Sequence, residues 1–139
     1  MLTMTSNFQA EIESLDSMMR FVRACLAPLA LPQADLHKIE LSMEEAIVNV
    51  INHAYQRAKG PIEIAFYHTP QTSIEFIIKD KGIPFNPLLE IKKVPHESTL
   101  EERKEGGLGI LLMLEYMDEV RYQRQYAFNV LTLVKHLSG

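Results

Sequence analysis

Two long segments in the first half of the chain repeat apolar residues at the spacing of an α-helix. The first covers residues 15–26 and follows Ser14, a residue type that commonly caps a helix. The second extends from about residue 34 to about residue 57, before the helix-stopping pair Gly60-Pro61. A shorter apolar run over residues 108–117 predicts a third helix.

Runs of β-branched and aromatic residues predict about five strands. A weak alternation of Phe8, Ala10 and Ile12 with polar residues indicates the first strand. The other runs form two predicted hairpins, residues 62–68 with 73–80 and residues 118–123 with 128–136. This order is typical of an α+β domain. We expect a two-layer sandwich, with a mostly antiparallel sheet and three helices on one face.

Composition narrows the class of protein. With 139 residues, of which 47% are hydrophobic and 23% charged, the chain has the composition of one ordinary soluble domain, and we expect residues 1–139 to form a single unit. The formal net charge of −4 argues against a nucleic-acid-binding surface, which needs clustered Lys and Arg. Cys25 is the single cysteine and cannot form an internal disulfide. Since the sequence shows no secretion signal and no membrane-spanning run, we expect a cytoplasmic protein.

The second predicted helix carries an unusual set of polar residues. Its broad apolar arc consists of Leu36, Ile39, Met43, Ala46, Ile47, Val50 and Ala54. Its opposite side carries Lys38, Ser42, Glu45, Asn49, Asn52 and His53. Asn49 could offer an amide oxygen to Mg²⁺, and Glu45, one turn earlier, could accept a proton from an attacking hydroxyl. The same pattern also fits an ordinary solvated helix face.

Two glycine-containing segments are further candidates for a binding site. In "KDKGIPFNP", the Asp80 carboxylate could accept a hydrogen bond from the amino group of adenine, and Gly82 would let a flat base approach the backbone. In "EGGLGI", the backbone amides of residues 106–109 could hold phosphate oxygens at a helix N-terminus. It is neither a Walker loop nor a dinucleotide fingerprint. A plain turn and a flexible hinge remain alternatives. The intervening residues 81–105 have the length of a lid or binding loop.

Taken together, these segments resemble the motifs of one superfamily. "EAIVNVINHAY" resembles the N box of the GHKL (Bergerat-fold) ATPases and kinases, "DKGIPFNP" their first glycine box and "GGLGI" their second. The likeness covers essentially the whole chain. Within the superfamily, the chain is most similar to the bacterial anti-sigma factor serine/threonine kinases.

The resemblance implies roles for the matching residues. Glu45 would be the general base, Asn49 the Mg²⁺ ligand and Asp80 the partner of the adenine amino group. The implied nucleotide-binding residues are Asn49, Asn52, His53, Asp80, Gly82, Phe85, Gly106, Gly107, Leu108 and Gly109. Residues 88–105 would form the lid, whose cations Lys92, Lys93, Arg103 and Lys104 are candidates for the γ-phosphate. One departure is Asn86, where the family often has Asp.

The implied activity is that of an ATP- and Mg²⁺-dependent protein serine/threonine kinase. As an anti-sigma regulatory factor it would bind a sigma factor and phosphorylate a STAS-type antagonist protein, and homodimers are common in the family. No contact with nucleic acid or membrane is expected. An alternative is a non-catalytic ATP/ADP-binding switch that sequesters a partner. The presence of both Glu45 and Asn49 favours an active enzyme. A histidine kinase is disfavoured because no acceptor hairpin precedes the N box.

Overall fold

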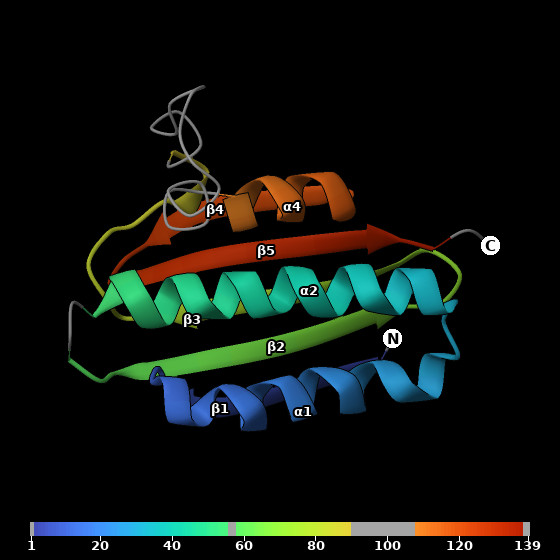
Figure 1. Ribbon diagram of the computed structural model, residues 1–139, viewed down its shortest axis with the longest axis horizontal. Helices are drawn as coiled ribbons and strands as arrows, with labels where there is room; N and C mark the ends of the chain where they lie inside the picture. Colours follow the sequence, from blue (N-terminus) through green and yellow to red (C-terminus); the bar gives the residue numbers. More distant parts are fainter. Residues whose placement is uncertain (1, 56–57, 90–107, 138–139) are drawn as a thin grey trace.

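The protein folds as one antiparallel sheet with helices on a single face (Figure 1). The computed structural model describes residues 2–55, 58–89 and 108–137, and only the backbone of Leu2 and Leu108. The sheet has the order β1-β2-β3-β5-β4. Its strands are β1 (Leu2–Gln9), β2 (Pro61–Thr69), β3 (Ser73–Asp80), β4 (Glu119–Gln125) and β5 (Phe128–His136). The α-helices in the described residues are α1 (Leu15–Leu26), α2 (Gln33–Asn49) and α4 (Leu108–Tyr116). The α+β sandwich predicted from the sequence is therefore confirmed.

Shorter helical segments connect or extend these elements. Two 3₁₀ turns, η1 (Ile12–Ser14) and η2 (Ala27–Leu29), flank α1. The helix α2 continues directly into a turn of π-helix, η3 (Val50–Ala54). Turns of π-helix are rare in proteins, and those that occur are often found at functional sites. The helix predicted from about residue 34 is thus present from Gln33 to Ala54, with a last turn wider than an α-helix, and its predicted end near residue 57 lies outside the described residues.

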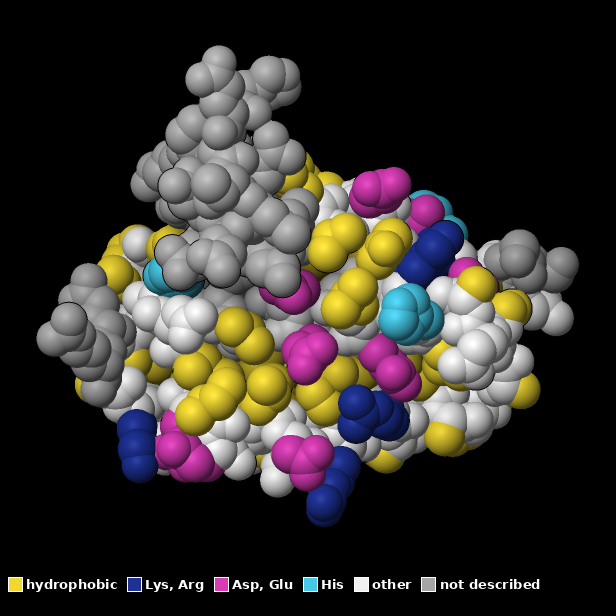
Figure 2. Space-filling view, in the orientation of Figure 1, with side chains coloured by type: hydrophobic (Ala, Val, Ile, Leu, Met, Phe, Trp, Pro, Cys, Tyr) yellow, Lys and Arg dark blue, Asp and Glu magenta, His cyan; other side chains and the backbone are white. Residues whose placement is uncertain are grey.

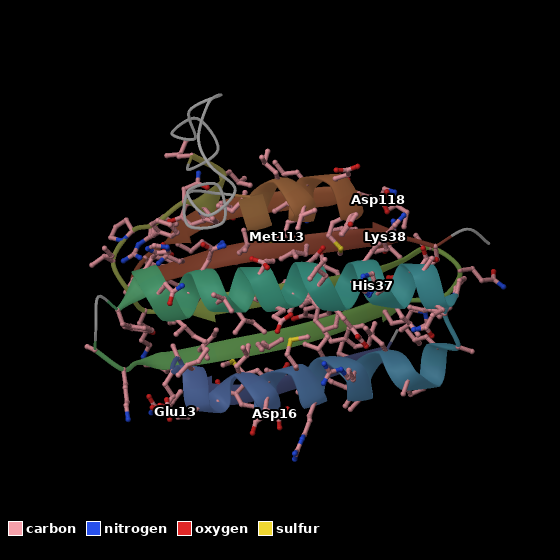
Figure 3. The ribbon with its side chains drawn as sticks, in the orientation of Figure 1. Glu13, Asp16, His37, Lys38, Met113 and Asp118 are labelled. Carbon is pink, nitrogen blue, oxygen red and sulfur yellow. The ribbon has the colours of Figure 1, made fainter. Side chains whose placement is uncertain are left out.

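The hydrophobic core lies between the sheet and the helices. Alternate residues of β3 point to the helices and are buried, because side chains of a strand alternate between its two faces. The rings of Phe66 and Phe76 meet there with centroids 5.0 Å apart. Met113 of α4 is fully buried and lies toward α2 (Figure 3). Cys25 is buried in the same core, and burial raises the pKa of its thiol to about 11, so the thiol stays protonated.

The first strand differs from the prediction. β1 starts at Leu2 and ends at Gln9, which pairs with the first residue of β2, Pro61. Beyond this pair the chain turns into η1, and Ile12 is 59% exposed. Ser14 occupies the N-cap position of α1, but its hydroxyl makes no capping hydrogen bond. The alternation of only three apolar residues misplaced the strand because the partner strand decides where pairing ends.

One assignment on α2 was wrong. Ser42 was placed on the polar side of the helix, yet it is fully buried. The helix α4 packs beside α2 and covers part of that side (Figure 1). The Ser42 hydroxyl has no hydrogen-bond partner among the described residues. Helical periodicity locates a residue on a side of its own helix, whereas a neighbouring helix decides whether that side meets water.

The outer surface of α4 is unusually apolar. Leu111 and Leu114 are each 41% exposed. Figure 2 shows hydrophobic side chains gathered over this helix, next to acidic groups. No described helix is long and apolar enough to cross a membrane.

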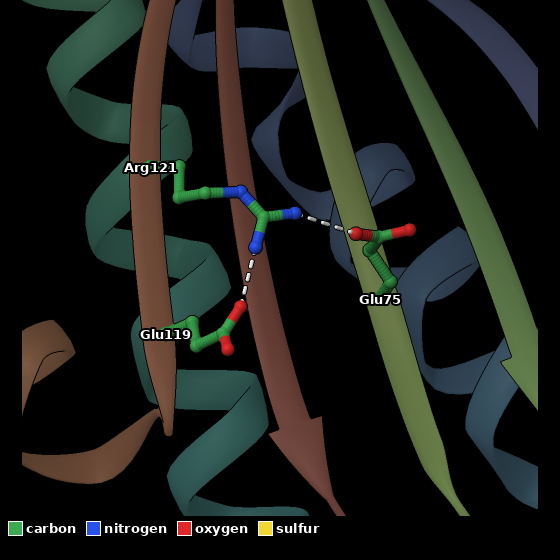
Figure 4. A network of polar contacts seen from close by, with 3 residues as sticks. All are labelled: Glu75, Glu119 and Arg121. Carbon is green, nitrogen blue, oxygen red and sulfur yellow. Dashed lines mark hydrogen bonds and ion pairs between the residues drawn. The ribbon is translucent and has the colours of Figure 1, made fainter.

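The other face of the sheet carries charged side chains. Arg121 of β4 donates hydrogen bonds to Glu119 and to Glu75 of β3, the latter over 3.1 Å (Figure 4). These side chains are partly exposed to water, so the pairs contribute little to stability, typically about 0–1 kcal/mol each. The chemistry predicted from the sequence lies instead at the face covered by the helices.

Candidate active site

A pocket opens between residues of α2, β3, β4 and β5 and of the loop after β3. The pocket is narrow, since the centre of a water molecule can occupy only about 20 Å³ of it. Its polar lining consists of Asn49, Asp80, Tyr122 and Asn129, and its other lining residues, including Phe85, are apolar. Three of the residues predicted from the sequence, Asn49, Asp80 and Phe85, thus line one pocket although they come from separate segments.

Asp80 is the charged group of this pocket. It ends β3 and is only 4% exposed. Its Oδ1 accepts hydrogen bonds from the Gly82 amide over 2.9 Å and from Asn129 Nδ2 over 2.8 Å. Burial raises the pKa of Asp80, while these two hydrogen bonds and the charge of Arg124 act in the opposite direction. Since both donors contact Oδ1, Oδ2 is left as an acceptor for a ligand.

Gly82 allows the loop after β3 to approach the end of η3. A β-carbon on Gly82 would lie 2.1 Å from the backbone oxygen of Ala54. The next residue, Ile83, donates its amide to the same oxygen over 2.9 Å. The glycine was predicted to make room for a base, but the close approach in the structure is to the protein backbone. Arg124 donates to the Gly82 carbonyl over 2.8 Å and holds the loop from the other side.

Two aromatic contacts complete this end of the site. The rings of His53 and Phe85 are stacked, with centroids 4.8 Å apart and an angle of 20° between their planes. The Tyr55 hydroxyl donates to the Pro61 carbonyl and accepts the Lys81 amide over 2.7 Å. His53 is exposed, and its ring contacts the pocket residue Phe85. These contacts join the end of the N-box segment to the loop that follows Asp80.

Glu45 lies against the beginning of α4. A β-carbon on Gly109, the second residue of α4, would stand 2.0 Å from Glu45 Oε2. Burial, and secondarily the charge of Glu44, raises the pKa of Glu45. A carboxylate with a raised pKa is a better proton acceptor near neutral pH than an ordinary one. The structure therefore places a carboxylate with a raised pKa beside the start of α4, where the sequence predicts phosphate binding.

Asn49 connects the carboxylate to the pocket. Its Nδ2 donates to the backbone oxygen of Glu45 over 3.1 Å, which leaves the amide oxygen available. Among the described residues, no group of three or more His, Cys, Asp or Glu side chains is arranged to hold a metal ion. A cation at Asn49 would therefore depend on water and on ligand oxygens, as Mg²⁺ does when it binds with a nucleotide. The donor set fits that kind of site.

Other predicted residues do not join the pocket or fall outside the described part. Asn52 is exposed and does not line the pocket. Asn86 accepts a hydrogen bond from the Leu88 amide over 3.0 Å, so its side chain shapes the local turn. Residues outside the described ranges include Gly106, Gly107 and the lid cations Lys92, Lys93, Arg103 and Lys104. Leu108 is described by its backbone alone, as the first residue of α4.

Asn129 was missed by the sequence analysis. It lies on β5 directly opposite Asp80 and is 4% exposed. The signal was present, because Asn129 is an uncharged polar residue within the apolar run of "FNVLTLV". A buried carboxamide needs hydrogen-bond partners, so it is often part of a network of hydrogen-bonded polar side chains.

Comparison with known proteins identifies the family. A sequence profile described as the histidine kinase-like ATPase domain matches residues 8–135. The chain belongs to the histidine kinase-like ATPase family. Its N-box, Asp80 and Gly109 segments are all within the matched range. ATP use is thus a property of the family to which this pocket belongs.

The similar members of this family include curated serine-protein kinases. The chain is 30% identical to the serine-protein kinase RsbW of Bacillus subtilis over 109 residues, which are 76% of this chain and 67% of that protein. It is 34% identical to RsbW of Oceanobacillus iheyensis, over 69% of this chain and 63% of that protein. The chain thus spans about two thirds of the length of these relatives. Serine-protein kinase is the activity that the names of these relatives give.

A solved structure shows the same fold. The crystal structure of the RsbU and RsbW domains of Rv1364c from Mycobacterium tuberculosis matches with a TM-score of 0.69 and 16% sequence identity. The match covers 99% of this chain and 33% of that chain. At this level of identity the likeness concerns the fold, which agrees with the topology described above.

Proposed function

We propose that the protein transfers the γ-phosphate of ATP to a serine or threonine of a partner protein. The observation that carries this proposal is the convergence of three segments on one site. The pocket contains Asp80 and Asn49, and Glu45 lies one helical turn from Asn49, against Gly109 at the start of α4. The similarity to proteins named serine-protein kinase supports the same reaction.

Each residue has a role in this proposal. Asp80 Oδ2 accepts a hydrogen bond from the adenine amino group, with Phe85 and Gly82 beside the base. The Asn49 amide oxygen contributes a ligand to Mg²⁺, which neutralises charge on the phosphates when it is bound. The backbone amides at the start of α4, with Gly106 and Gly107 before them, hold phosphate oxygens. Asn52 and His53 are secondary members of the site.

Glu45 acts as the general base. Its carboxylate accepts the proton of the acceptor hydroxyl while the hydroxyl oxygen attacks the γ-phosphorus. The new O–P bond replaces the bond between the γ-phosphorus and the β,γ-bridging oxygen, and ADP leaves with that electron pair. The raised pKa of Glu45 supports this role because the carboxylate binds the proton more readily.

The proposed partners are those of an anti-sigma regulatory factor. The protein would bind a sigma factor. It would also bind and phosphorylate a STAS-type antagonist, which competes with the sigma factor for binding to this protein. A homodimer in the cytoplasm is part of the proposal. The bound nucleotide would set which partner is preferred. The second candidate is a switch that binds ATP or ADP without catalysis, and the position of Glu45 beside α4 favours the enzyme.

A phosphotransfer assay tests the proposed function. The protein is mixed with Mg-ATP labelled at the γ-phosphate and with candidate antagonist proteins, and phosphoserine and phosphothreonine are identified. Glu45→Ala should slow transfer by about 10²–10⁴-fold, the usual contribution of a general base, and should preserve ATP affinity. Glu115→Ala, an exposed change on α4, serves as the control. Normal transfer by Glu45→Ala would contradict the base assignment, and stable capture of a sigma factor without transfer would favour the switch.

A further inference from the structure

Asn129 uses its whole hydrogen-bonding capacity within the protein. Its Nδ2 donates to Asp80 Oδ1 over 2.8 Å and to the Ile83 carbonyl over 2.7 Å. Its Oδ1 accepts the Phe85 amide over 3.2 Å and the Tyr122 hydroxyl over 2.5 Å. A carboxamide offers two donor hydrogens and two acceptor lone pairs, so none is left for a ligand. Asn129 therefore acts on the pocket through the groups that it holds.

Two of these contacts determine how Asp80 is presented. Asn129 and the Gly82 amide both donate to Oδ1, which restricts rotation of the carboxylate, and Oδ2 has no donor among the described residues. Donors on an ionised carboxylate favour the charged form, which only accepts hydrogen bonds. The other contacts hold the loop at Ile83 and Phe85, and Phe85 lines the pocket.

We propose that Asn129 is a positioning residue that makes the pocket select a 6-aminopurine over a 6-oxopurine. By keeping Asp80 a fixed acceptor, it matches the amino group of adenine and opposes the carbonyl of hypoxanthine or guanine. This inference rests on the proposed function, in which Asp80 contacts the purine. It goes further because it assigns base selectivity to a residue that does not contact the base.

The chemistry of the alternatives explains why asparagine suits this position. An aspartate at 129 would put two carboxyl groups in contact, and such a pair shares a proton. When the proton of the pair sits on Oδ2 of Asp80, that oxygen becomes an O–H donor to the carbonyl of a 6-oxopurine. A leucine would remove both donors and leave the Ile83 carbonyl without its partner. The two donor hydrogens of the asparagine carboxamide satisfy Asp80 and Ile83 together.

The test compares two nucleotides that differ in the base and share the same triphosphate. The dissociation constants of Mg-ATP and Mg-ITP are measured by calorimetry for the unmodified protein, Asn129→Asp and Asn129→Thr. The unmodified protein should prefer ATP. In Asn129→Asp the ratio of the ITP to the ATP dissociation constant should fall by about tenfold or more. This change corresponds to the loss of one hydrogen bond to a charged group. Asn129→Thr keeps one hydroxyl donor for Asp80 and should lie between the two.

Two matched controls separate positioning from general damage to the strand. Thr132→Val changes another buried residue of β5 and should leave the ATP-to-ITP ratio unchanged. Val130→Thr changes the neighbouring residue of β5, whose side chain lies on the opposite face of the sheet from Asn129, so the ratio should also persist. Thermal unfolding of every variant shows whether it is folded at the temperature of the titration.

The results of these titrations distinguish a failure of the Asn129 inference from a failure of the proposed function. An unchanged ratio in a folded Asn129→Asp or Asn129→Thr variant would overturn the inference, as would equal affinity of the unmodified protein for ATP and ITP. If Asn129→Asp does not fold, the ratio for Asn129→Thr decides. If the unmodified protein binds neither nucleotide, the proposed function itself fails.

Discussion

The carboxylate of Glu45 touches the α-carbon region of Gly109, so closely that an added β-carbon would stand 2.0 Å from Oε2. This contact joins the middle of α2 to the first turn of α4. The residue proposed as general base is therefore held by the same helix start that is proposed to receive the phosphates. Any larger residue at position 109 would displace the end of the Glu45 side chain.

Gly109→Ala should separate catalysis from stability. The new methyl group displaces the end of the flexible Glu45 side chain, and a displacement of about 1 Å can cost about 10²-fold in rate. Alanine is also the better helix former by about 1 kcal/mol, so the free energy of unfolding should change little. Phosphotransfer and chemical denaturation are measured together, with Leu111→Ala on the exposed side of α4 as the control. Normal transfer by Gly109→Ala would show that the contact is not needed for catalysis.

The rate of transfer should depend on the ionisation of Glu45. Burial raises its pKa, and the charge of Glu44 raises it further. A general base must be deprotonated, so the rate should fall as pH decreases through this raised pKa. Glu44→Gln removes the second cause and should move the acidic limb of the pH–rate profile to lower pH. A limb that stays in place in Glu44→Gln would mean that another group controls the rate.

Gly82→Ala should disturb both the fold and the pocket. Its β-carbon would meet the Ala54 backbone oxygen at 2.1 Å, and the backbone cannot rotate away as a side chain can. The loop must move, which weakens the Ile83–Ala54 hydrogen bond and costs about 1–3 kcal/mol. Urea unfolding and ATP titration should both show the loss. Ile83→Ala, an exposed change at the next position, is the control and should affect unfolding much less.

Asp80→Asn should make the protein more stable while it weakens ATP binding. The folded state raises the pKa of Asp80, so the wild-type protein loses stability as pH rises through that value. The asparagine carries no charge, so its burial avoids this cost. The free energy of unfolding should therefore rise by about 0.5–2 kcal/mol at neutral pH, the usual size of a stabilising substitution. The gain should shrink below the ordinary pKa of an aspartate. Denaturation curves at several pH values measure it, and a gain that is independent of pH would contradict this cause.

Ser42→Ala should be neutral or stabilising. The Ser42 hydroxyl is fully buried and has no partner in the described residues, so its removal relieves a desolvation cost of about 1 kcal/mol. Thermal unfolding measures the change. Thr132→Ala, at a second buried hydroxyl residue, gives the comparison. A marked loss of stability in Ser42→Ala would indicate that the hydroxyl has a partner, such as an ordered water.

The spacing of apolar residues predicted the helices and the two hairpins, because a helix or strand with one buried side places apolar residues at its own characteristic interval. It failed at Ile12, where only three residues supported the strand and the pairing ends before Ala10. It also failed at Ser42, whose side of α2 is covered by α4. A repeat along one element contains no information about the element that packs on it.

The sequence by itself determined the α+β fold, the order of the motifs and the chemical types at Glu45, Asn49 and Asp80. Only the tertiary structure decided that Glu45 meets Gly109 and that Asn129 holds Asp80. These contacts join residues that are 64 and 49 positions apart in the chain. The reason is physical: local patterns depend on near neighbours, whereas the orientation of a buried polar group is set by distant partners that the folded sheet brings into register.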